Sequence, residues 1–188
     1  MKTTLALIAS LMAIYGNFSY LRDVYLDKIK PHPFTWFVWT IVSGVNFFGQ
    51  IVKGAGVGVI PTGVAESFTL LIFLYSLKYD FKTIKMNEVV YLVISLLGLI
   101  PWFFLKDPTI SVIIVVLVDL VAFVPTIEKT WRNPDSERAP LYLMNVGRHL
   151  LTLMSLQSYN IATTFHSIAM IGANSIMSEI ILKKRIIK

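Results

Sequence analysis

The sequence predicts an all-α integral membrane protein with seven transmembrane helices. Hydrophobic residues make up 55% of its 188 residues and charged residues only 15%, whereas about a quarter of an ordinary soluble domain is charged. Long segments are apolar on all sides, which a bilayer favours and water does not. Breaks rich in proline, glycine and charged residues separate these segments. Composition and pattern therefore indicate the same fold class.

Each expected span is long enough to cross a bilayer as a helix. About 18 to 22 residues, each rising roughly 1.5 Å, cover a hydrocarbon core of ~30 Å. The first span follows Lys2 and has the position of a signal peptide, but Leu11 stands where cleavage after Ala13 needs a small residue. We therefore expect the first span to be retained. The expected spans are residues 4–21, 34–52, 58–77, 88–105, 108–127, 140–157 and 161–182.

Loop charge predicts the orientation of these helices. Only Lys2, Lys53 and Lys106 flank one set of span ends. Thirteen cations flank the other set, and cytoplasmic loops of membrane proteins carry such an excess. The N-terminus is therefore expected outside and the C-terminus in the cytoplasm. The thirteen are Arg22, Lys28, Lys30, Lys78, Lys82, Lys85, Lys129, Arg132, Arg138, Lys183, Lys184, Arg185 and Lys188.

A shift of 106 residues indicates an internal repeat, because it lays the first three spans on the last three. The fourth span is left as a linker. Because the linker is a single helix, the two three-helix units lie in the same, parallel orientation, which is a 3+1+3 arrangement. The expected divisions are a first unit at 1–79, a linker helix at 80–107 and a second unit at 108–188.

The repeat aligns a stripe of polar and aromatic side chains. Positions on the second span fall on positions of the sixth in steps of three or four residues, so each set lies on one helix face. We expect the two stripes to face a space between the units. Trp36, Trp39, Ser43 and Asn46 fall on Tyr142, Asn145, His149 and Thr152, respectively.

Two stretches of the chain resemble a widespread bacterial family of uncharacterised seven-helix membrane proteins. The first runs from Lys30 to Trp39 (KPHPFTWFVW) and continues with Phe47, Phe48 and Gln50. The second runs from Asp119 to Pro134 (DLVAFVPTIEKTWRNP). The motifs and their spacing cover most of residues 10–150. The resemblance implies a multi-pass protein of the bacterial plasma (inner) membrane.

The chain is also similar, more distantly, to the PQ-loop and SWEET superfamily of small-molecule transporters. The likeness depends on the 3+1+3 plan, the outside N-terminus and the helix-breaking Pro125 in the first helix of the second unit. The Pro-Gln pair is absent, because Thr126 follows Pro125 and Ser19-Tyr20 stand at the equivalent site of the first unit. The resemblance implies that a small polar solute crosses by alternating access through a central cavity, but it does not extend to sugar specificity.

Ionisable side chains near the middle of expected spans indicate a functional site. Glu66, Asp119, Arg148 and His149 are such groups, and each costs about 2.5 to 3.5 kcal/mol to insert into a bilayer. Asp119 and Arg148 lie at similar depth and are expected to pair, either as a structural ion pair or as a gate that substrate or proton binding opens. Glu66 has no cation in its own unit. It either exchanges protons or sits protonated in a helix interface.

Amide side chains and one tryptophan complete the candidate site. Each asparagine taken alone favours interhelical hydrogen bonding. Taken together, the asparagines are expected to line a cavity between the units, with Trp39 as a wall. The expected substrate-binding residues are Asn17, Trp39, Asn46, Glu66, Asp119, Asn145, Arg148, His149 and Asn174.

Several chemistries are not expected. The chain has no cysteine, which excludes disulfides and thiolate metal sites. It has no glycine-rich phosphate loop, no His-Glu-x-x-His pair and no nucleophile elbow, so neither an enzyme nor a cofactor is predicted. His32, His149 and His166 fall on different elements and are not expected to bind a metal. Basic residues lie in loops, which argues against nucleic acid as a partner.

The expected partners are the lipid bilayer and an unknown small polar solute, and the sequence leaves open whether the chain forms a homo-oligomer. A second hypothesis is a non-transporting receptor or assembly partner that recognises another protein. Its sequence feature is a pair of cytoplasmic loops with mixed charges, at residues 23–33 and 128–140.

Overall fold

The computed structural model describes residues 1–27, 31, 33–79, 86–132, 134 and 139–186, and these form helices joined by short connections, without a strand. All seven expected spans are helical, so the all-α prediction is confirmed. The elements are α1 (Lys2–Tyr25), α2 (Pro33–Val52), the 3-10 turn η1 (Gly56–Val59), α3 (Ile60–Ser76), α4 (Met86–Leu97), α5 (Ile100–Leu105), α6 (Thr109–Arg132), α7 (Ala139–Ser155) and α8 (Ile161–Ile186).

Five stretches of the described residues are long and apolar enough to cross a membrane. They are α1, α2, η1 with α3, α6, and α8 as far as Lys183. These stretches match the first, second, third, fifth and seventh expected spans. The sixth, α7, has 17 residues.

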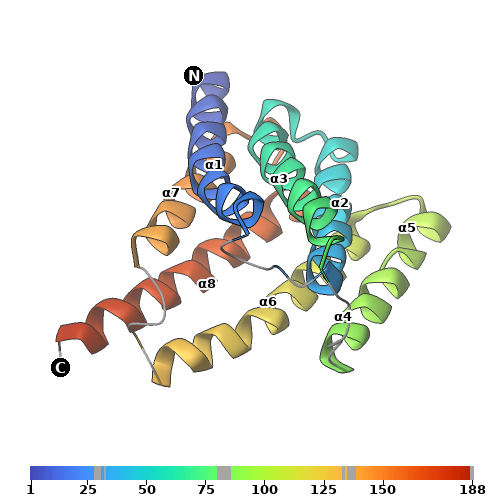
Figure 1. Cartoon of the computed structure of the whole chain (residues 1–188). Helices are drawn as coiled ribbons and strands as arrows, with labels where there is room; N and C mark the ends of the chain where they lie inside the picture. The colour runs from blue at the N-terminus through green and yellow to red at the C-terminus, as the bar shows by residue number, and fades with distance from the viewer. Residues whose placement is uncertain (28–30, 32, 80–85, 133, 135–138, 187–188) are drawn as a thin grey trace.

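The expected span at 88–105 is broken into two helices. Pro101 lies in the first turn of α5, and it has no backbone N–H to donate to a carbonyl one turn earlier. The backbone N–H of Gly98 still donates to the Ile94 carbonyl at 2.8 Å, but α4 ends at Leu97. The linker is therefore a bent pair of short helices, and it lies on the far side of α2 from α1 (Figure 1).

One end of the molecule gathers the N-terminus and three connections, and we call it the Lys2 end. The Lys2 ammonium donates to the Leu156 carbonyl, and the Gln157 backbone N–H donates to the Ala55 carbonyl at 3.0 Å. Lys53 pairs with Asp107 at 2.6 Å. The start of α1 and the α2–α3, α5–α6 and α7–α8 connections are therefore neighbours.

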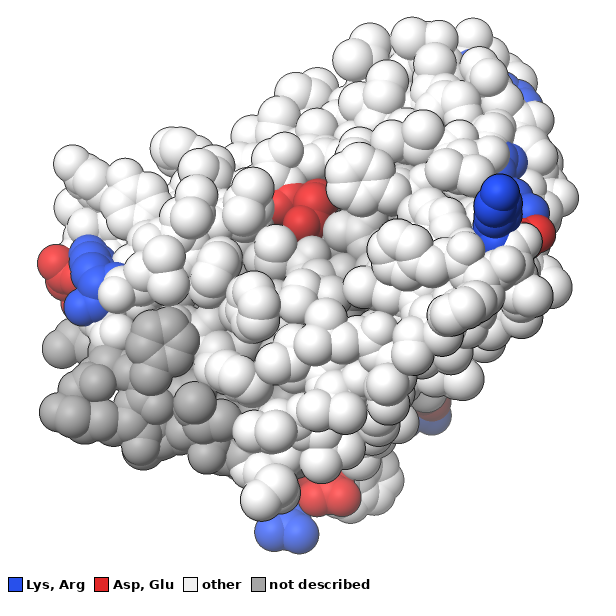
Figure 2. Space-filling view, turned by 90° about the vertical axis from the view of Figure 1, so that its right-hand side faces the viewer, with Lys and Arg blue, Asp and Glu red and all other residues white. Residues whose placement is uncertain are grey.

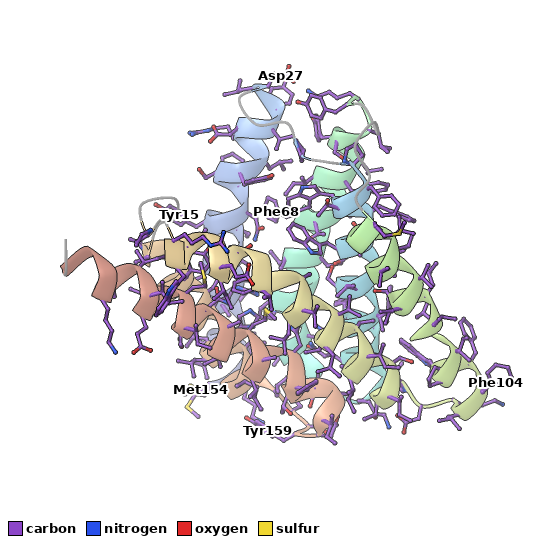
Figure 3. The ribbon with its side chains drawn as sticks, turned by 90° about the horizontal axis from the view of Figure 1, so that it is seen from below. Tyr15, Asp27, Phe68, Phe104, Met154 and Tyr159 are labelled. Carbon is purple, nitrogen blue, oxygen red and sulfur yellow. The ribbon has the colours of Figure 1, made fainter. Side chains whose placement is uncertain are left out.

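The opposite end, which we call the Asp27 end, joins the ends of α1 and α3. Asp27 accepts a hydrogen bond from the Tyr79 hydroxyl at 2.6 Å and pairs with Lys78 at 2.8 Å. Figure 3 shows Asp27 and Tyr159 at opposite sides of the molecule. The start of α1 and the α2–α3 connection thus lie at the Lys2 end, while the far ends of α1 and α3 lie together at the Asp27 end, as spans that cross a bilayer in turn would require.

The helices pack as two groups, each with its third helix in the middle. Helix α3 contacts both α1 and α2, and α8 contacts both α6 and α7. The groups meet where α1 packs on α7 and where α2 packs on α6. In Figure 1, α1 and α3 stand upright while α6 and α8 cross the view obliquely.

Small residues allow both crossings between the groups. A Cβ atom at Gly16 of α1 would lie 2.9 Å from the Met144 side chain of α7. A Cβ atom at Gly49 of α2 would lie 2.5 Å from Val112 of α6. An apolar cluster of valines from α2 and α6 extends the second crossing. The groups are therefore joined by close backbone approach as well as by loop contacts.

Gly58 should tolerate a methyl group poorly, although its backbone dihedral angles are open to any residue. A Cβ there would lie 2.7 Å from the Leu156 Cα atom, and backbone cannot move aside as a side chain can. We expect Gly58→Ala to destabilise the protein by about 1 to 3 kcal/mol. The matched control is Gly172→Ala, because nothing lies within 4 Å of the added methyl group in α8. Thermal unfolding in detergent measures both, and equal midpoints would contradict this packing.

The ion pair between Lys53 and Asp107 should depend on pH. The Lys53 ammonium, then the Thr109 side chain and backbone N–H, lower the pKa of Asp107 to about 2. A depressed pKa contributes stability above the unfolded value near 4, and this contribution is lost as the pH falls through 2. We therefore expect Asp107→Asn to lower the unfolding midpoint at pH 6 and to make no difference below pH 2. In a Lys53→Gln background, the effect of Asp107→Asn at pH 6 should be smaller, and an undiminished effect would exclude the pair as its cause.

Candidate functional site

The structure distributes the nine expected site residues over two clusters and one separate position. Trp39, Asn46 and Glu66 lie on α2 and α3 in the first group of helices. Five residues of α6, α7 and α8 lie in the second group, namely Asp119, Asn145, Arg148, His149 and Asn174. Asn17 is separate on α1, where its amide donates to the Ala13 carbonyl of its own helix at 2.8 Å.

Glu66 is held against α2 by Ser43. The Ser43 hydroxyl lies within hydrogen-bond distance of the Glu66 carboxyl group and of the Trp39 carbonyl. Gly44 leaves room for the carboxyl group, since a Cβ atom there would lie 3.9 Å from Glu66 Oε1. Glu66 is half-buried on the flank of α3 that meets α2. No basic side chain pairs with it among the described residues.

A buried row of polar side chains follows on the same two helices toward the Lys2 end. Gln50 donates to Asn46 Oδ1 at 3.3 Å and accepts from the Thr62 hydroxyl at 3.3 Å. Asn46 is 1% exposed and Gln50 is fully buried. The Asn46 amide nitrogen has no partner in the described part of the chain. The row joins α2 to α3, which is the interhelical role expected of a single asparagine.

Trp39 belongs to an aromatic ladder between α1 and α2. Its ring packs edge-on against Trp36 at 5.1 Å, and Trp36 packs on Tyr20 at 5.3 Å. Tyr142, 106 residues after Trp36, packs edge-on against Phe123 of α6 at 6.4 Å. In both groups of helices, an aromatic side chain at this position therefore joins the first two helices.

In the second group, four ionisable side chains form a continuous series that we call the Asp119–Arg148 row. Asp119 Oδ2 of α6 lies 3.8 Å from His166 Nε2 of α8. The His166 ring packs edge-on against the His149 ring of α7, with centroids 5.4 Å apart. His149 Nε2 lies 2.7 Å from Arg148 Nη2, and its Nδ1 lies 3.3 Å from the Ser167 hydroxyl. The row joins all three helices of the group.

Asp119 and Arg148 do not form the ion pair expected from the sequence. Each contacts a histidine instead, and the two imidazole rings lie between them in the sequence of contacts. Among the described residues, neither group has a closer partner of opposite charge. The two candidates do belong to one polar cluster, as their depth indicated.

His166 is the member of the row that sequence reasoning left out. It lies on a different span from His149, and nothing in its spacing along the chain links the two histidines. A signal was present, since His166 precedes the buried Met170, Ala173 and Met177 by four, seven and eleven residues. That spacing puts the histidine on the packed face of α8.

The two remaining amides contact each other. The Asn145 amide of α7 lies 3.4 Å from Asn174 Oδ1 of α8, and Asn174 also donates to the Met170 carbonyl at 2.7 Å. The pair extends the Asp119–Arg148 row by one helical turn along α7. Asn17 makes no such contact to another helix within the described residues.

Figure 2 shows how charge is distributed on one face of the molecule. Lysine, arginine and acidic side chains gather toward the edges of this face, and an acidic side chain lies in the middle of an uncharged area. Within the described residues, no group of three His, Cys, Asp or Glu side chains has the arrangement of a metal site.

An open apolar groove of about 570 Å³ lies apart from the candidate residues. It runs between α2 and α5, and none of the nine expected residues lines it. It is lined by Val45, Phe48, Val52, Leu99, Trp102, Phe103 and Lys106. A groove of this composition on the outer side of α2 suits a hydrocarbon chain better than a polar solute.

The chain was compared with known protein families, with curated proteins and with solved structures, and nothing matches it. The resemblance to bacterial seven-helix proteins and to the PQ-loop and SWEET superfamily is therefore still a prediction from the sequence.

Proposed function

We propose that the chain is a multi-pass protein of the plasma membrane with its Lys2 end outside and its Asp27 end in the cytoplasm. Five of its helices are long and apolar enough to cross a bilayer. Lys2, Lys53 and Lys106 are the cations of the outer set in the sequence, and contacts put Lys2 and Lys53 together. The thirteen cations of the opposite set favour the cytoplasm.

The helices α1–α3 and α6–α8 are proposed to be two parallel repeats joined by the α4–α5 linker. The contacts between elements support this, because α3 and α8 occupy the same middle place in their groups. If the groups are repeats, α1 corresponds to α6 and α2 corresponds to α7. The contact of α1 with α7 then corresponds to the contact of α6 with α2, and both contacts occur. Such an exchange is expected of parallel repeats related by an axis along the membrane normal.

The function that these features favour is transport of a small polar solute by alternating access between the two repeats. The observation that carries this proposal is the Asp119–Arg148 row, which brings an acid, a cation and two imidazoles together, with Asp119, Arg148 and His149 near the middle of their helices. Ionisable groups at that depth are costly and typically mark a solute or proton pathway. Glu66 adds a further acid on the other repeat.

The orientation can be tested with single cysteines, because the chain has none of its own. Tyr159 is 60% exposed at the Lys2 end, and Lys78 is exposed at the Asp27 end. In intact cells, a membrane-impermeant maleimide should label the Tyr159→Cys variant and spare the Lys78→Cys variant. Permeabilised cells should show both labelled. The reverse pattern in intact cells would overturn the proposed orientation.

Charge control of transport predicts that neutral variants of the buried acids stop uptake. A metabolite that raises the thermal unfolding midpoint of the purified protein would be radiolabelled and offered to proteoliposomes. We expect Asp119→Asn and Glu66→Gln to reduce uptake at least tenfold while inserting at wild-type levels. Lys183→Gln removes an exposed charge at the far end of α8 and should leave uptake unchanged.

The outcomes separate the hypotheses. Full uptake in both neutral variants would exclude control of uptake by the charges of Asp119 and Glu66. If wild-type protein binds metabolites but never moves them, transport fails as the function. A stable complex with a soluble protein through residues 23–33 and 128–140 would then favour the receptor or assembly hypothesis.

A further inference from the structure

The Arg148 guanidinium lacks an acidic partner in the described part of the chain. Its Nη2 atom meets the His149 ring at 2.7 Å, and its Nε atom is buried without a hydrogen-bond partner among those residues. A guanidinium is charged at every physiological pH. A charge at membrane depth without a counterion is strongly destabilising, so the site is suited to an incoming anion.

His166 presents a second unpaired nitrogen in the same cluster. Its Nε2 faces Asp119 at 3.8 Å, and its Nδ1 is buried without a partner in the part of the chain that the structure describes. His149 and His166 have their rings in contact, so the two orphaned nitrogens belong to one polar cluster. Buried nitrogens of this kind usually have a partner, and a polar ligand can supply it.

The partly exposed members of the cluster lie on a different side of their helices from the most exposed apolar side chains. The side chains of Asp119 and His166 are 23% and 17% exposed. Both are two residues from strongly exposed positions, Leu117 at 50% and Ile168 at 55%. Two residues correspond to a turn of about 200° around a helix. The exposed parts of Asp119 and His166 therefore face away from the surface that Leu117 and Ile168 present to lipid.

We propose that the solute is a small carboxylate monoanion whose carboxylate binds the Arg148 guanidinium beside His149 and His166. This inference rests on the proposed transport function and names the class of its substrate. A planar carboxylate accepts two parallel N–H bonds from a guanidinium. The cluster holds a single permanent cation, and Asp119 adds an acid nearby, so one negative charge fits better than the two of a phosphate. His149, Ser167 and Asn174 are each at most 4% exposed, so they leave little free space beside Arg148. The anion is therefore expected to be small.

Thermal unfolding of the purified full-length chain tests the binding of probe anions. Acetate and lactate are compared with acetamide and glycerol, which have similar sizes and no charge, and sodium chloride keeps the ionic strength constant. At about a hundredfold excess over Kd, a bound carboxylate should raise the midpoint by about 5 °C or more, and the neutral probes should not. Equal shifts for charged and neutral probes, or none for any carboxylate, would overturn the proposal.

Variants of Arg148 identify the binding group. Arg148→Gln should abolish the carboxylate shift. Arg148→Lys keeps the charge and so tests the site even where Arg148→Gln fails to fold; losing the planar fork should weaken carboxylate binding about tenfold. Lys183→Gln, which removes an exposed cation of the same chain, should bind as the wild type does. Wild-type affinity in Arg148→Lys together with an undiminished shift in Arg148→Gln would exclude this site.

The inference and the transport function fail separately. The protein could take up a neutral solute while carboxylates neither compete with that uptake nor raise the unfolding midpoint. This result would leave the transport function standing and overturn the proposal that the solute is a carboxylate. Binding of carboxylates at Arg148 without any uptake into proteoliposomes would support the site and remove the transport function.

Discussion

The contact between the α2–α3 and α7–α8 connections fixes how the two groups of helices sit together. Its centre is a backbone hydrogen bond from Gln157 to the Ala55 carbonyl, supported by the Asn160 amide on the Lys53 carbonyl at 3.1 Å. Gly56 has a positive φ of 60° and lies directly against Gln157, so a side chain there would be strained and would clash. With this end joined, α1 packs on α7 and α2 packs on α6.

The apolar surroundings of the long helices explain how their polar side chains are hydrogen-bonded. Most serine and threonine hydroxyl groups of the long helices donate a hydrogen bond to the backbone carbonyl one turn earlier. Thr40 donates to Trp36 and Ser178 donates to Asn174 in this way. Ser43 does so as well on Trp39, and it also meets the Glu66 carboxyl group of α3. His149, 106 residues later in the chain, meets Arg148 and Ser167. The two clusters therefore differ in charge, since the first holds an acid and the second holds both an acid and a cation.

The sequence was sufficient to locate the helices, and five of the expected spans coincide with helices long and apolar enough to cross a membrane, because span length and apolar composition are local properties. It was not sufficient for the linker, where Gly98 and Pro101 break a span that hydropathy alone reads as continuous. It also paired Asp119 with Arg148, because depth can be counted along a chain but rotation and crossing of helices cannot. The rotation and crossing of α6, α7 and α8 place His166 and His149 between Asp119 and Arg148. His166 therefore links Asp119 to the rest of the cluster.

The joined Lys2 end bears on how such a molecule can change shape. Both helix crossings between the groups place a glycine against a side chain, Gly16 on Met144 and Gly49 on Val112, and the second lies close to the Lys53–Asp107 pair. Smooth crossings of this kind allow small rotations, whereas the loop contacts resist them. Opening the Lys2 end breaks a few hydrogen bonds, each worth about 0.5 to 1.5 kcal/mol net. The sum is a few kcal/mol, the separation at which two conformations exchange and a bound solute can shift their populations. In the proposed cycle, the loop contacts would therefore set the resting state without preventing the alternative.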